Sequence, residues 1–228
     1  MLKLGLDLSL SSIRPQGEWT PADETSLVAW YQNKVGITLS GSDVSVWRDS
    51  SSNSYDMLQD TATEQPAYDA GTGVLTFVRG DLNNLQTTGQ IELSGDFTIG
   101  IRVNPAIAGA GTFLGDNTTT KELFKFASGI RMTVKMDLSG AIQLDLDAGT
   151  FGDDYLVITR VSNVLTLWQN GVAQTGTTPT LAGTADIDAI GIRFSDNDAF
   201  DGTIKEVQIY SSSSAGLTAN INDRLATL

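Results

Sequence analysis

The sequence of 228 residues contains neither cysteine nor histidine. Disulfide bonds, thiolate nucleophiles, zinc sites of the usual type and every catalytic triad that uses histidine are therefore excluded together. No stretch of the sequence is long and apolar enough to cross a bilayer. We expect stability to come from burial of a hydrophobic core or from assembly.

Basic residues are scarce as well. The chain has 14 lysines and arginines against 27 aspartates and glutamates, which gives a formal net charge of −13. A surface of this sign repels phosphate groups, so we expect no nucleic-acid partner. It is compatible with a solvated acidic face, with a basic protein partner or with a divalent cation.

Short apolar runs, many of them alternating, recur along residues 27–228 and are separated by residues typical of turns. This pattern predicts strands. The predicted strands are Val44–Trp47, Val74–Val78, Phe97–Val103, Thr112–Leu114, Leu123–Phe126, Arg131–Met136, Ile142–Leu146, Tyr155–Arg160, Val164–Gln169, Ile187–Phe194 and Thr203–Tyr210. No helix alternates with them, which favours an antiparallel two-sheet sandwich over a parallel α/β fold.

Two local signals in the sequence add detail to the predicted fold. Residues 161–163 predict one turn, and Asn170-Gly171 predicts a second, of type I′, because these residues accept positive φ angles. Near the end of the chain, apolar residues recur every three or four positions, which predicts one short C-terminal helix on the sandwich. These residues are Leu217, Ile221, Leu225 and Leu228.

The N-terminal residues follow a different pattern. Apolar and other residues alternate strictly from residue 2 to residue 10, which predicts an extended strand and lacks the continuous apolar core of a secretory signal. The apolar members are Leu2, Leu4, Leu6, Leu8 and Leu10. Residues 11–25 contain Pro15, Gly17 and Pro21 and predict an irregular connector. We therefore divide the chain into an extended docking arm, residues 1–26, and a sandwich domain, residues 27–228.

The arm has two interpretations. It forms either an edge strand of the sandwich or a strand added to the sheet of a neighbouring subunit. Trp19 lies in the connector and is the candidate interface anchor, together with the alternating leucines. Trp30, Trp47 and Trp168 lie within apolar or alternating runs, so we expect them to pack in the core.

Two segments carry a resemblance to a known family. The first runs through Leu27-Val28-Ala29-Trp30, Gly36–Gly41, Val44-Ser45-Val46-Trp47-Arg48-Asp49 and Gln65-Pro66-Ala67-Tyr68, and the second is Phe200–Tyr210 with the helix after it. Both segments resemble concanavalin A-like, laminin-G-type jelly rolls. The resemblance spans about residues 27–228, and between the two segments it rests on strand rhythm and the Asn170-Gly171 hairpin. It implies two antiparallel sheets, one of them concave, with loops at the rim.

Such domains with an added N-terminal strand are similar to virion proteins of tailed bacteriophages. The resemblance implies a structural protein, such as a capsid decoration, head fibre or tail component, in a virion assembled in the host cytoplasm. Its partners would be other virion proteins and further copies of itself in a homo-oligomer. The alternative is a lectin-like module that binds a surface glycan, with calcium as an aid.

Catalytic groups are not apparent in the sequence. Glycoside hydrolases of the resembled family carry a Glu-x-Asp-x-(x)-Glu strand, and this sequence has no such run. Asp145 and Asp147 share a strand face but have no third carboxylate at the required spacing. We therefore expect a protein that is not an enzyme.

One acidic loop contains oxygen ligands of the kind that calcium prefers. Asp196, Asp198 and Asp201 are its calcium candidates, although Gly202 stands one place too late for an EF-hand. The competing interpretation is an ordinary turn in which aspartate and asparagine bind the local backbone, and we favour it. We expect no cofactor other than this candidate calcium ion.

Overall fold

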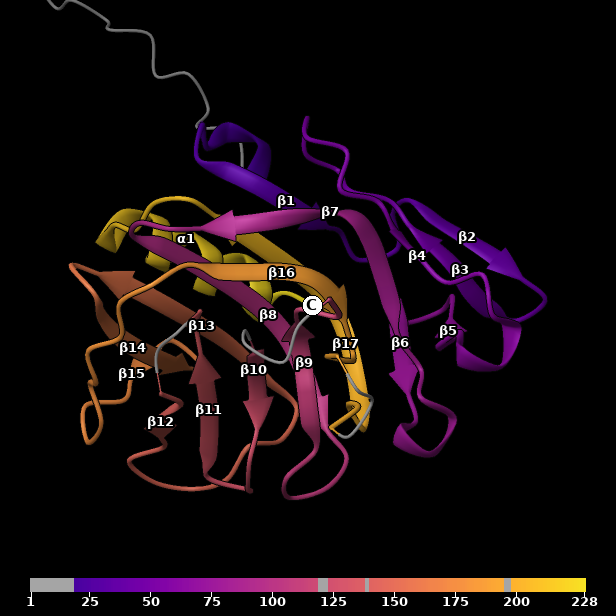
Figure 1. The fold of residues 1–228 in the computed structure, drawn as a ribbon. Coiled ribbons are helices and arrows are strands. Elements are labelled where there is room, and N and C mark those ends of the chain that lie inside the picture. Colours follow the sequence, from indigo (N-terminus) through magenta and orange to yellow (C-terminus); the bar gives the residue numbers. More distant parts are fainter. Residues whose placement is uncertain (1–18, 119–122, 138–139, 195–197) are drawn as a thin grey trace, which may run out of the picture.

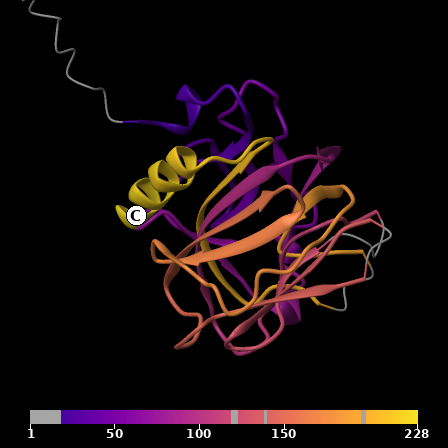
Figure 2. The ribbon, with the colours of Figure 1, turned by 90° about the vertical axis from the view of Figure 1, so that its left-hand side faces the viewer.

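The computed structural model describes residues 19–118, 123–137, 140–194 and 198–228. Within these residues the chain forms seventeen strands, three short 3-10 helices and one α-helix (Figure 1). Every pairing between the named strands is antiparallel, as the sequence predicts. The strands form two layers, and the α-helix lies on the outer side of one of them (Figure 2). No helix in this part of the chain is long and apolar enough to span a membrane.

We call the first layer the helix-covered layer. Its central strands pair over long registers, and β8 contacts both β17 and β13 along most of its length. In spatial order the layer contains β1 (Leu27–Tyr31), β17 (Gly202–Tyr210), β8 (Phe97–Pro105), β13 (Asp154–Val161), β14 (Val164–Gln169) and β15 (Val172–Ala173).

We call the second layer the open layer, and it faces the viewer in Figure 1. In spatial order it contains β2 (Ile37–Ser40), β3 (Asp43–Trp47), β4 (Met57–Leu58), β7 (Leu85–Leu93), β16 (Ala185–Ile190), β9 (Gly111–Gly115), β10 (Leu123–Phe126), β11 (Arg131–Lys135) and β12 (Ile142–Asp145). Two further strands, β5 (Ala67–Asp69) and β6 (Val74–Phe77), connect the layers, because β5 pairs with β3 and β6 pairs with β17.

The core lies between the layers. On β8, Phe97, Ile99, Ile101 and Val103 are all buried, which confirms the face predicted from their alternation. Phenylalanines of the open layer meet this face, and the Phe97 and Phe124 rings stand edge to face at 6.2 Å. Each such buried apolar side chain stabilises the fold by about 1.5–3 kcal/mol.

The predicted C-terminal helix is confirmed as α1 (Ala215–Ala226). It begins where the Ser214 side chain accepts a hydrogen bond from the Leu217 backbone N–H at 3.1 Å, an N-cap that satisfies one free donor of the first turn. Its apolar face, with Leu217, Ile221 and Leu225, packs on Tyr210 and Val157 of the helix-covered layer, and Leu228 packs beside them. Gly100 permits this close approach, because a Cβ there would collide with Ile221 Cγ2.

The hairpins form as expected, with one correction. Asn170 and Gly171 have φ angles of 51° and 79°, as a type I′ turn requires. The turn before β14 was predicted over residues 161–163, but Val161 pairs with Val164. Only Ser162 and Asn163 form the turn, and both have positive φ.

Other strand boundaries also differ from the prediction. The strand β7 was not predicted, because its middle, Thr87-Thr88-Gly89-Gln90, has no apolar alternation. The predicted strand Ile187–Phe194 begins at Ala185 and ends at Ile190, where Gly191 takes a φ of 90° and the chain turns. A bulge between Ile204 and Glu206 explains the imperfect alternation of β17, because it returns Val207 to the core face.

The predicted docking arm is described only in part. Leu2, Leu4, Leu6, Leu8 and Leu10 lie outside the described residues. Residues 19–26 lie on the sandwich and include a 3-10 helix, η1 (Pro21–Asp23), that begins with a capping box between Thr20 and Asp23. The other 3-10 helices are η2 (Ala62–Glu64) and η3 (Arg79–Asp81).

Candidate functional site

The outer face of the open layer carries a group of hydrogen-bonded polar side chains contributed by β7, β16 and the loop after β9. We call this group the amide–carboxylate cluster, and it consists of Gln86, Gln90, Asp116, Asn117, Thr118 and Asp188. Asp116 and Asp188 are buried, with 1% and 5% of their surface exposed, whereas the two glutamines are half-buried. The cluster therefore presents ordered polar groups at an accessible surface.

Asn117 is the centre of the cluster. Its backbone N–H donates to Asp188 Oδ1 at 2.6 Å, and its side-chain Nδ2 donates to Gln86 Oε1 at 2.8 Å. Thr118 donates from its backbone N to Asp116 Oδ1 at 2.7 Å, and Gln90 Nε2 donates to Thr118 Oγ1 at 3.1 Å. Because each orientation is set by a neighbour, these side chains are held in place before any ligand arrives.

An irregularity in the sheet places Asp188. The register between β16 and β7 shifts between Ile187 and Ala189, where the β7 partner changes from Ile91 to Gln86. Bulges of this kind re-aim side chains near functional sites. Here the shift allows Asp188 to reach the loop after β9.

The electrostatics of Asp188 are unusual. Burial, with a smaller contribution from the neighbouring charges of Asp116 and Asp186, raises the pKa of its carboxyl group to about 6, although the hydrogen bond from the Asn117 N–H opposes the rise. Perturbed pKa values are enriched at functional sites, although structural networks also produce them.

Phe194 stands at the edge of the cluster. Its backbone N–H donates to the Asp116 carbonyl at 2.9 Å, so the loop after β16 lies against the end of β9. The residue is 45% exposed, which is uncommon for a phenylalanine beside buried polar groups. The backbone of an exposed aromatic residue is therefore joined directly to the backbone of the cluster.

A groove of about 400 Å³ continues from the cluster towards β4. We call it the β4–β7 groove, and its lining includes Leu58, Gln59, Glu64, Gln86 and Thr88. Gln86 belongs to both the groove and the cluster. The two features therefore form one continuous polar surface.

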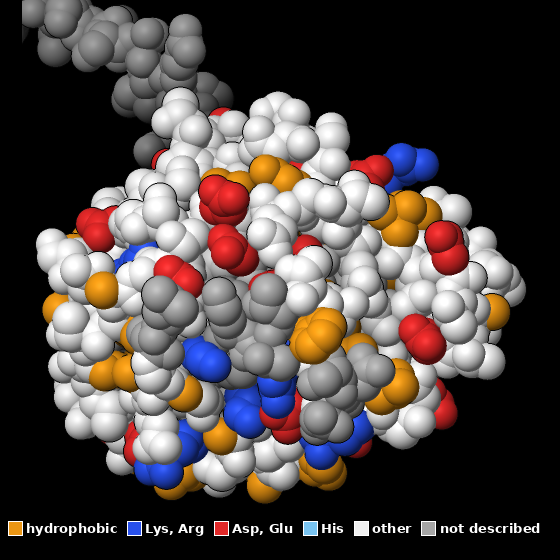
Figure 3. Space-filling model, viewed as in Figure 1, with side chains coloured by type: hydrophobic (Ala, Val, Ile, Leu, Met, Phe, Trp, Pro, Cys, Tyr) orange, Lys and Arg blue, Asp and Glu red, His pale blue; other side chains and the backbone are white. Residues whose placement is uncertain are grey.

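Charge is distributed unevenly on this face. Figure 3 shows acidic side chains gathered over β7 and β16 and basic ones over β9 to β11. Among the latter, Lys125 Nζ and Arg193 Nη2 lie 3.0 and 2.7 Å from Asp198 Oδ2. Burial acts to raise the pKa of Asp198, but these hydrogen bonds and charges outweigh it and hold the pKa below its usual value.

This arrangement bears on the candidate calcium ligands. Asp198 already binds two cationic side chains, and Asp196 lies outside the described residues. Asp201 is half-buried, and its backbone pairs with Ala106 and Ala110. Across the described part of the chain, no three acidic side chains gather in a way that could hold a metal ion. Calcium binding at this loop stays the less favoured of the two interpretations.

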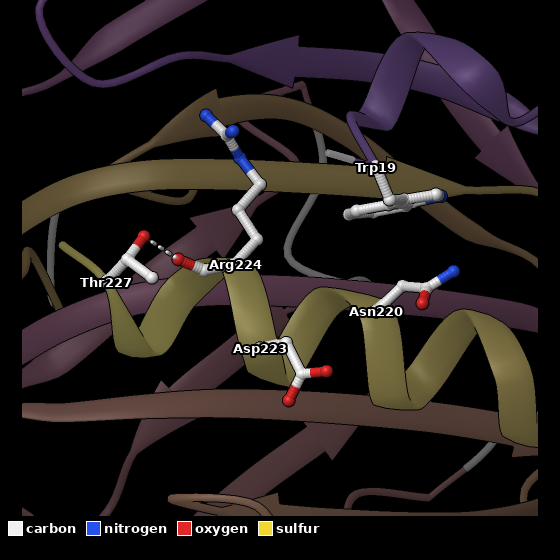
Figure 4. Close-up of a pocket in the computed structure, with 5 residues that line it drawn as sticks. All are labelled: Trp19, Asn220, Asp223, Arg224 and Thr227. Atoms are coloured by element: carbon white, nitrogen blue, oxygen red, sulfur yellow. Dashed lines mark hydrogen bonds between the residues drawn. The ribbon is translucent and has the colours of Figure 1, made fainter. Parts of the chain in front are cut away.

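A second hollow lies on the opposite side of the molecule, between Trp19 and α1. It has a volume of about 310 Å³ and is lined by Trp19, Asn220, Asp223, Arg224 and Thr227. The Trp19 ring lies alongside the helix (Figure 4). Its Nε1 donates to Glu24 Oε1 at 2.9 Å. The predicted anchor residue thus packs against the cluster that α1 forms with the helix-covered layer.

The other tryptophans and acidic pairs have structural surroundings. Trp30 and Trp47 are buried, which confirms the expectation for these two, whereas Trp168 is half-buried and packs beside the helix cluster. Asp145 forms two hydrogen bonds with Arg131, at 2.7 and 2.8 Å. Asp147 accepts hydrogen bonds from the backbone of residues 175 and 176 instead, so the two carboxylates do not act as a pair.

The sequence analysis did not identify the amide–carboxylate cluster. Its residues are separated by as many as 102 positions, from Gln86 to Asp188, and they meet because β16 pairs with both β7 and β9. The one local signal was Asp186-Ile187-Asp188, in which two carboxylates flank a core residue on a strand.

Comparisons with known proteins give the fold. No family model matches the chain, and no curated protein matches it. Domain 4 of AbnA, a GH43 extracellular arabinanase from Geobacillus stearothermophilus solved in complex with arabinotriose, superposes with a TM-score of 0.55 and 16% identity, covering 88% of this chain and 98% of that domain.

Two further solved structures have similar scores. Trypanosoma rangeli sialidase in complex with 2,3-difluorosialic acid gives a TM-score of 0.52 at 14% identity, covering 90% of this chain. The chain spans 33% of that sialidase. A heptameric SAP-like pentraxin from Limulus polyphemus gives 0.50 at 10% identity, covering 61% of this chain and 73% of the pentraxin. All are β-sandwich proteins, so the expected jelly-roll fold is confirmed.

Proposed function

We propose that this chain is a non-catalytic, lectin-like module that binds carbohydrate on the outer face of its open layer. The observation that carries the proposal is the position of the exposed Phe194 beside the amide–carboxylate cluster. Sugars combine hydroxyl groups with apolar C–H faces. A site that binds them needs planar donors and acceptors next to an aromatic surface.

The cluster supplies these donors and acceptors. Asn117 and Gln86, both half-buried, each offer an amide group with hydrogen-bonding capacity beyond its internal bonds, and the buried Asp188 carboxylate holds the Asn117 backbone in place. Because neighbours already fix their orientation, a ligand loses little affinity to ordering them. The neighbour with the highest TM-score above is an arabinanase domain in complex with arabinotriose, which fits this proposal by analogy of fold.

The absence of catalysis is part of the proposal. In glycoside hydrolysis one carboxyl group protonates the leaving oxygen and a second one must reach the sugar or a water. The candidate second carboxyl group beside Asp188 is that of Asp116. It already accepts hydrogen bonds from the backbone N–H and the Oγ1 hydroxyl of Thr118, so its oxygen is used internally. We expect no reducing sugar to be released when the protein is incubated with any glycan that it binds.

The binding experiment is isothermal titration with neutral oligosaccharides, beginning with arabinotriose. We expect Phe194→Ala to raise the Kd about tenfold, because the variant loses the contact between the ring and the sugar. A tenfold change corresponds to about 1.4 kcal/mol of binding free energy. The matched control is Ile107→Ala, since Ile107 is 49% exposed but lies in the loop between β8 and β9. If both variants bind as tightly as the wild type, Phe194 is not part of the binding site.

A second candidate role concerns assembly. The alternating leucines at residues 2–10 and the packing of Trp19 against α1 support docking through residues 1–26, as in a bacteriophage virion protein with homo-oligomeric copies. The sandwich would then display the glycan site. Deletion of residues 2–10 should abolish incorporation into particles but leave glycan binding unchanged, and unchanged incorporation would contradict this role.

A further inference from the structure

We infer that the β4–β7 groove is a second subsite, so that the ligand is an uncharged oligosaccharide that extends from the amide–carboxylate cluster across β7 towards β4. This inference rests on the proposed function and specifies its ligand. It depends on three features of the open layer: the continuity of the groove with the cluster, its chemical lining and its charge.

Gln86 provides the continuity. Its Oε1 accepts from Asn117 in the cluster, and its Nε2 donates to Asn84 Oδ1 at 2.8 Å. Asn84 Oδ1 also accepts from Gln59 Nε2 at 2.9 Å, and Gln59 lies in the groove. A chain of amide side chains thus connects the two subsites without a break. Gln59 and Asn84 are buried, so Gln86, which is half-buried, is the member of this chain that a ligand can contact at both subsites.

The lining of the groove has the same mixed character as the cluster. Leu58 is 39% exposed and pairs directly with Gln86, so an apolar surface lies next to an amide. Thr61 and Thr88 add hydroxyl groups, and both residues are exposed. The volume of about 400 Å³ equals that of about thirteen water molecules in the liquid, enough for one or two sugar units.

The charge of this surface determines the class of sugar. Asp60 and Glu64 line the groove, and Asp116, Asp186 and Asp188 lie at the cluster. The basic side chains of the open layer gather on its other half, over β9 to β11 (Figure 3). Carboxylate or sulfate groups on a sugar would meet like charges at both subsites, and like charges oppose binding. Uncharged sugars meet no such opposition.

The first experiment varies the length of the ligand. Neutral arabino- and cello-oligosaccharides of one to six units are titrated into the full chain. We expect the affinity to rise by at least about tenfold between one and three units, because a linked second unit binds at high effective concentration. Thr88→Trp, which places bulk in the groove at an exposed position, should abolish this rise while binding of the single unit persists.

The control and the outcomes separate this inference from the proposed function. Thr178→Trp introduces the same bulk at an exposed threonine outside both subsites and should retain the rise. If single units bind and longer chains bind no better, the groove is not a subsite, although the proposed function stands. If no neutral sugar binds at any length, the proposed function itself fails.

The second experiment tests charge selection. Lactose and sialyllactose share the same neutral unit and differ by one acidic sugar. We expect sialyllactose to bind at least about tenfold more weakly at low salt, and the difference to shrink in the Asp60→Asn, Glu64→Gln double variant. Tighter binding of sialyllactose than of lactose would overturn the assignment to uncharged sugars.

Discussion

The outer faces of the two layers carry polar groups of similar type but in opposite surroundings. On the helix-covered layer, Glu206 is fully buried beneath Trp30 and α1. On the open layer, the amide–carboxylate cluster lies at the surface beside a groove. The helix therefore turns one face into a second core, while the other face is left accessible.

The buried face shows how a carboxylate can be stabilised away from water. Glu206 accepts two hydrogen bonds from Arg224, at 2.6 and 2.9 Å, and further bonds from Trp30, Gln208 and the Asn33 backbone. The Arg224 guanidinium also lies 4.9 Å from the centre of the Trp30 ring. Every oxygen is used internally, so we assign this network to attachment of the helix rather than to ligand binding.

The largest effect is expected from breaking this network. Glu206→Ala leaves Arg224 and the other donors buried without their acceptor, which should lower the free energy of unfolding by about 3–5 kcal/mol. In a chain of this length that corresponds to a fall in Tm of about 10 °C, measured by calorimetry. Glycan binding by the folded fraction should not change. A loss of affinity at a temperature where the variant is folded would show that the two faces are coupled.

The second prediction concerns Asp188 and pH. Its raised pKa means that the folded state holds the proton more tightly, so its contribution favours folding at low pH and is lost as pH rises from about 4 through about 6. Asp188→Asn removes the buried charge and should raise stability by up to about 3 kcal/mol at pH 8 but change it little below pH 4.

Thermal unfolding from pH 3.5 to pH 8 measures this difference, and curves for the two proteins that run parallel would contradict it. Glycan binding supplies a second readout. Protonation of Asp188 removes the carboxylate that accepts the Asn117 N–H, so wild-type affinity should fall below about pH 6. The Asp188→Asn variant should show no such change between pH 5 and pH 7.

The third prediction concerns the contact between α1 and β8. Gly100→Val introduces a side chain that collides with Ile221, and overpacking of this kind costs about 1–3 kcal/mol. Chemical denaturation measures the change. The matched control is Gly95→Ala, since a Cβ at Gly95 meets no other atom within 4 Å. If Gly100→Val is as stable as the control, α1 does not pack as closely as described.

The difference between a covered face and an accessible face also explains which elements could be predicted from the sequence. The strand β8 was visible because Phe97, Ile99, Ile101 and Val103 face a core that selects apolar residues at every second position. The helix was visible for the same reason, because its leucines face Tyr210 and Val157. Burial on one face leaves a periodic signal, so most of the strands and the C-terminal helix were predictable.

The open face leaves no such signal. The strand β7 was missed because Thr87-Thr88-Gly89-Gln90 belongs to the accessible side and to the irregular register opposite β16. The cluster was missed because Gln86, Asn117 and Asp188 are brought together by strand pairing over long sequence separations. Periodicity reports what a residue packs against, whereas a binding site depends on which strands become neighbours.

The smallest expected effect comes from another paired arginine and carboxylate, Arg131 and Asp145 on the open layer. Its two hydrogen bonds, at 2.7 and 2.8 Å, resemble those of Arg224 and Glu206, but the side chains are 39% and 24% exposed rather than 19% and 0%. Water competes for exposed ions, so Arg131→Ala should shift the midpoint of urea unfolding far less than Glu206→Ala does. Because bond geometry is so similar in the two pairs, a loss as large as that of Glu206→Ala would mean that burial does not set the difference between the faces.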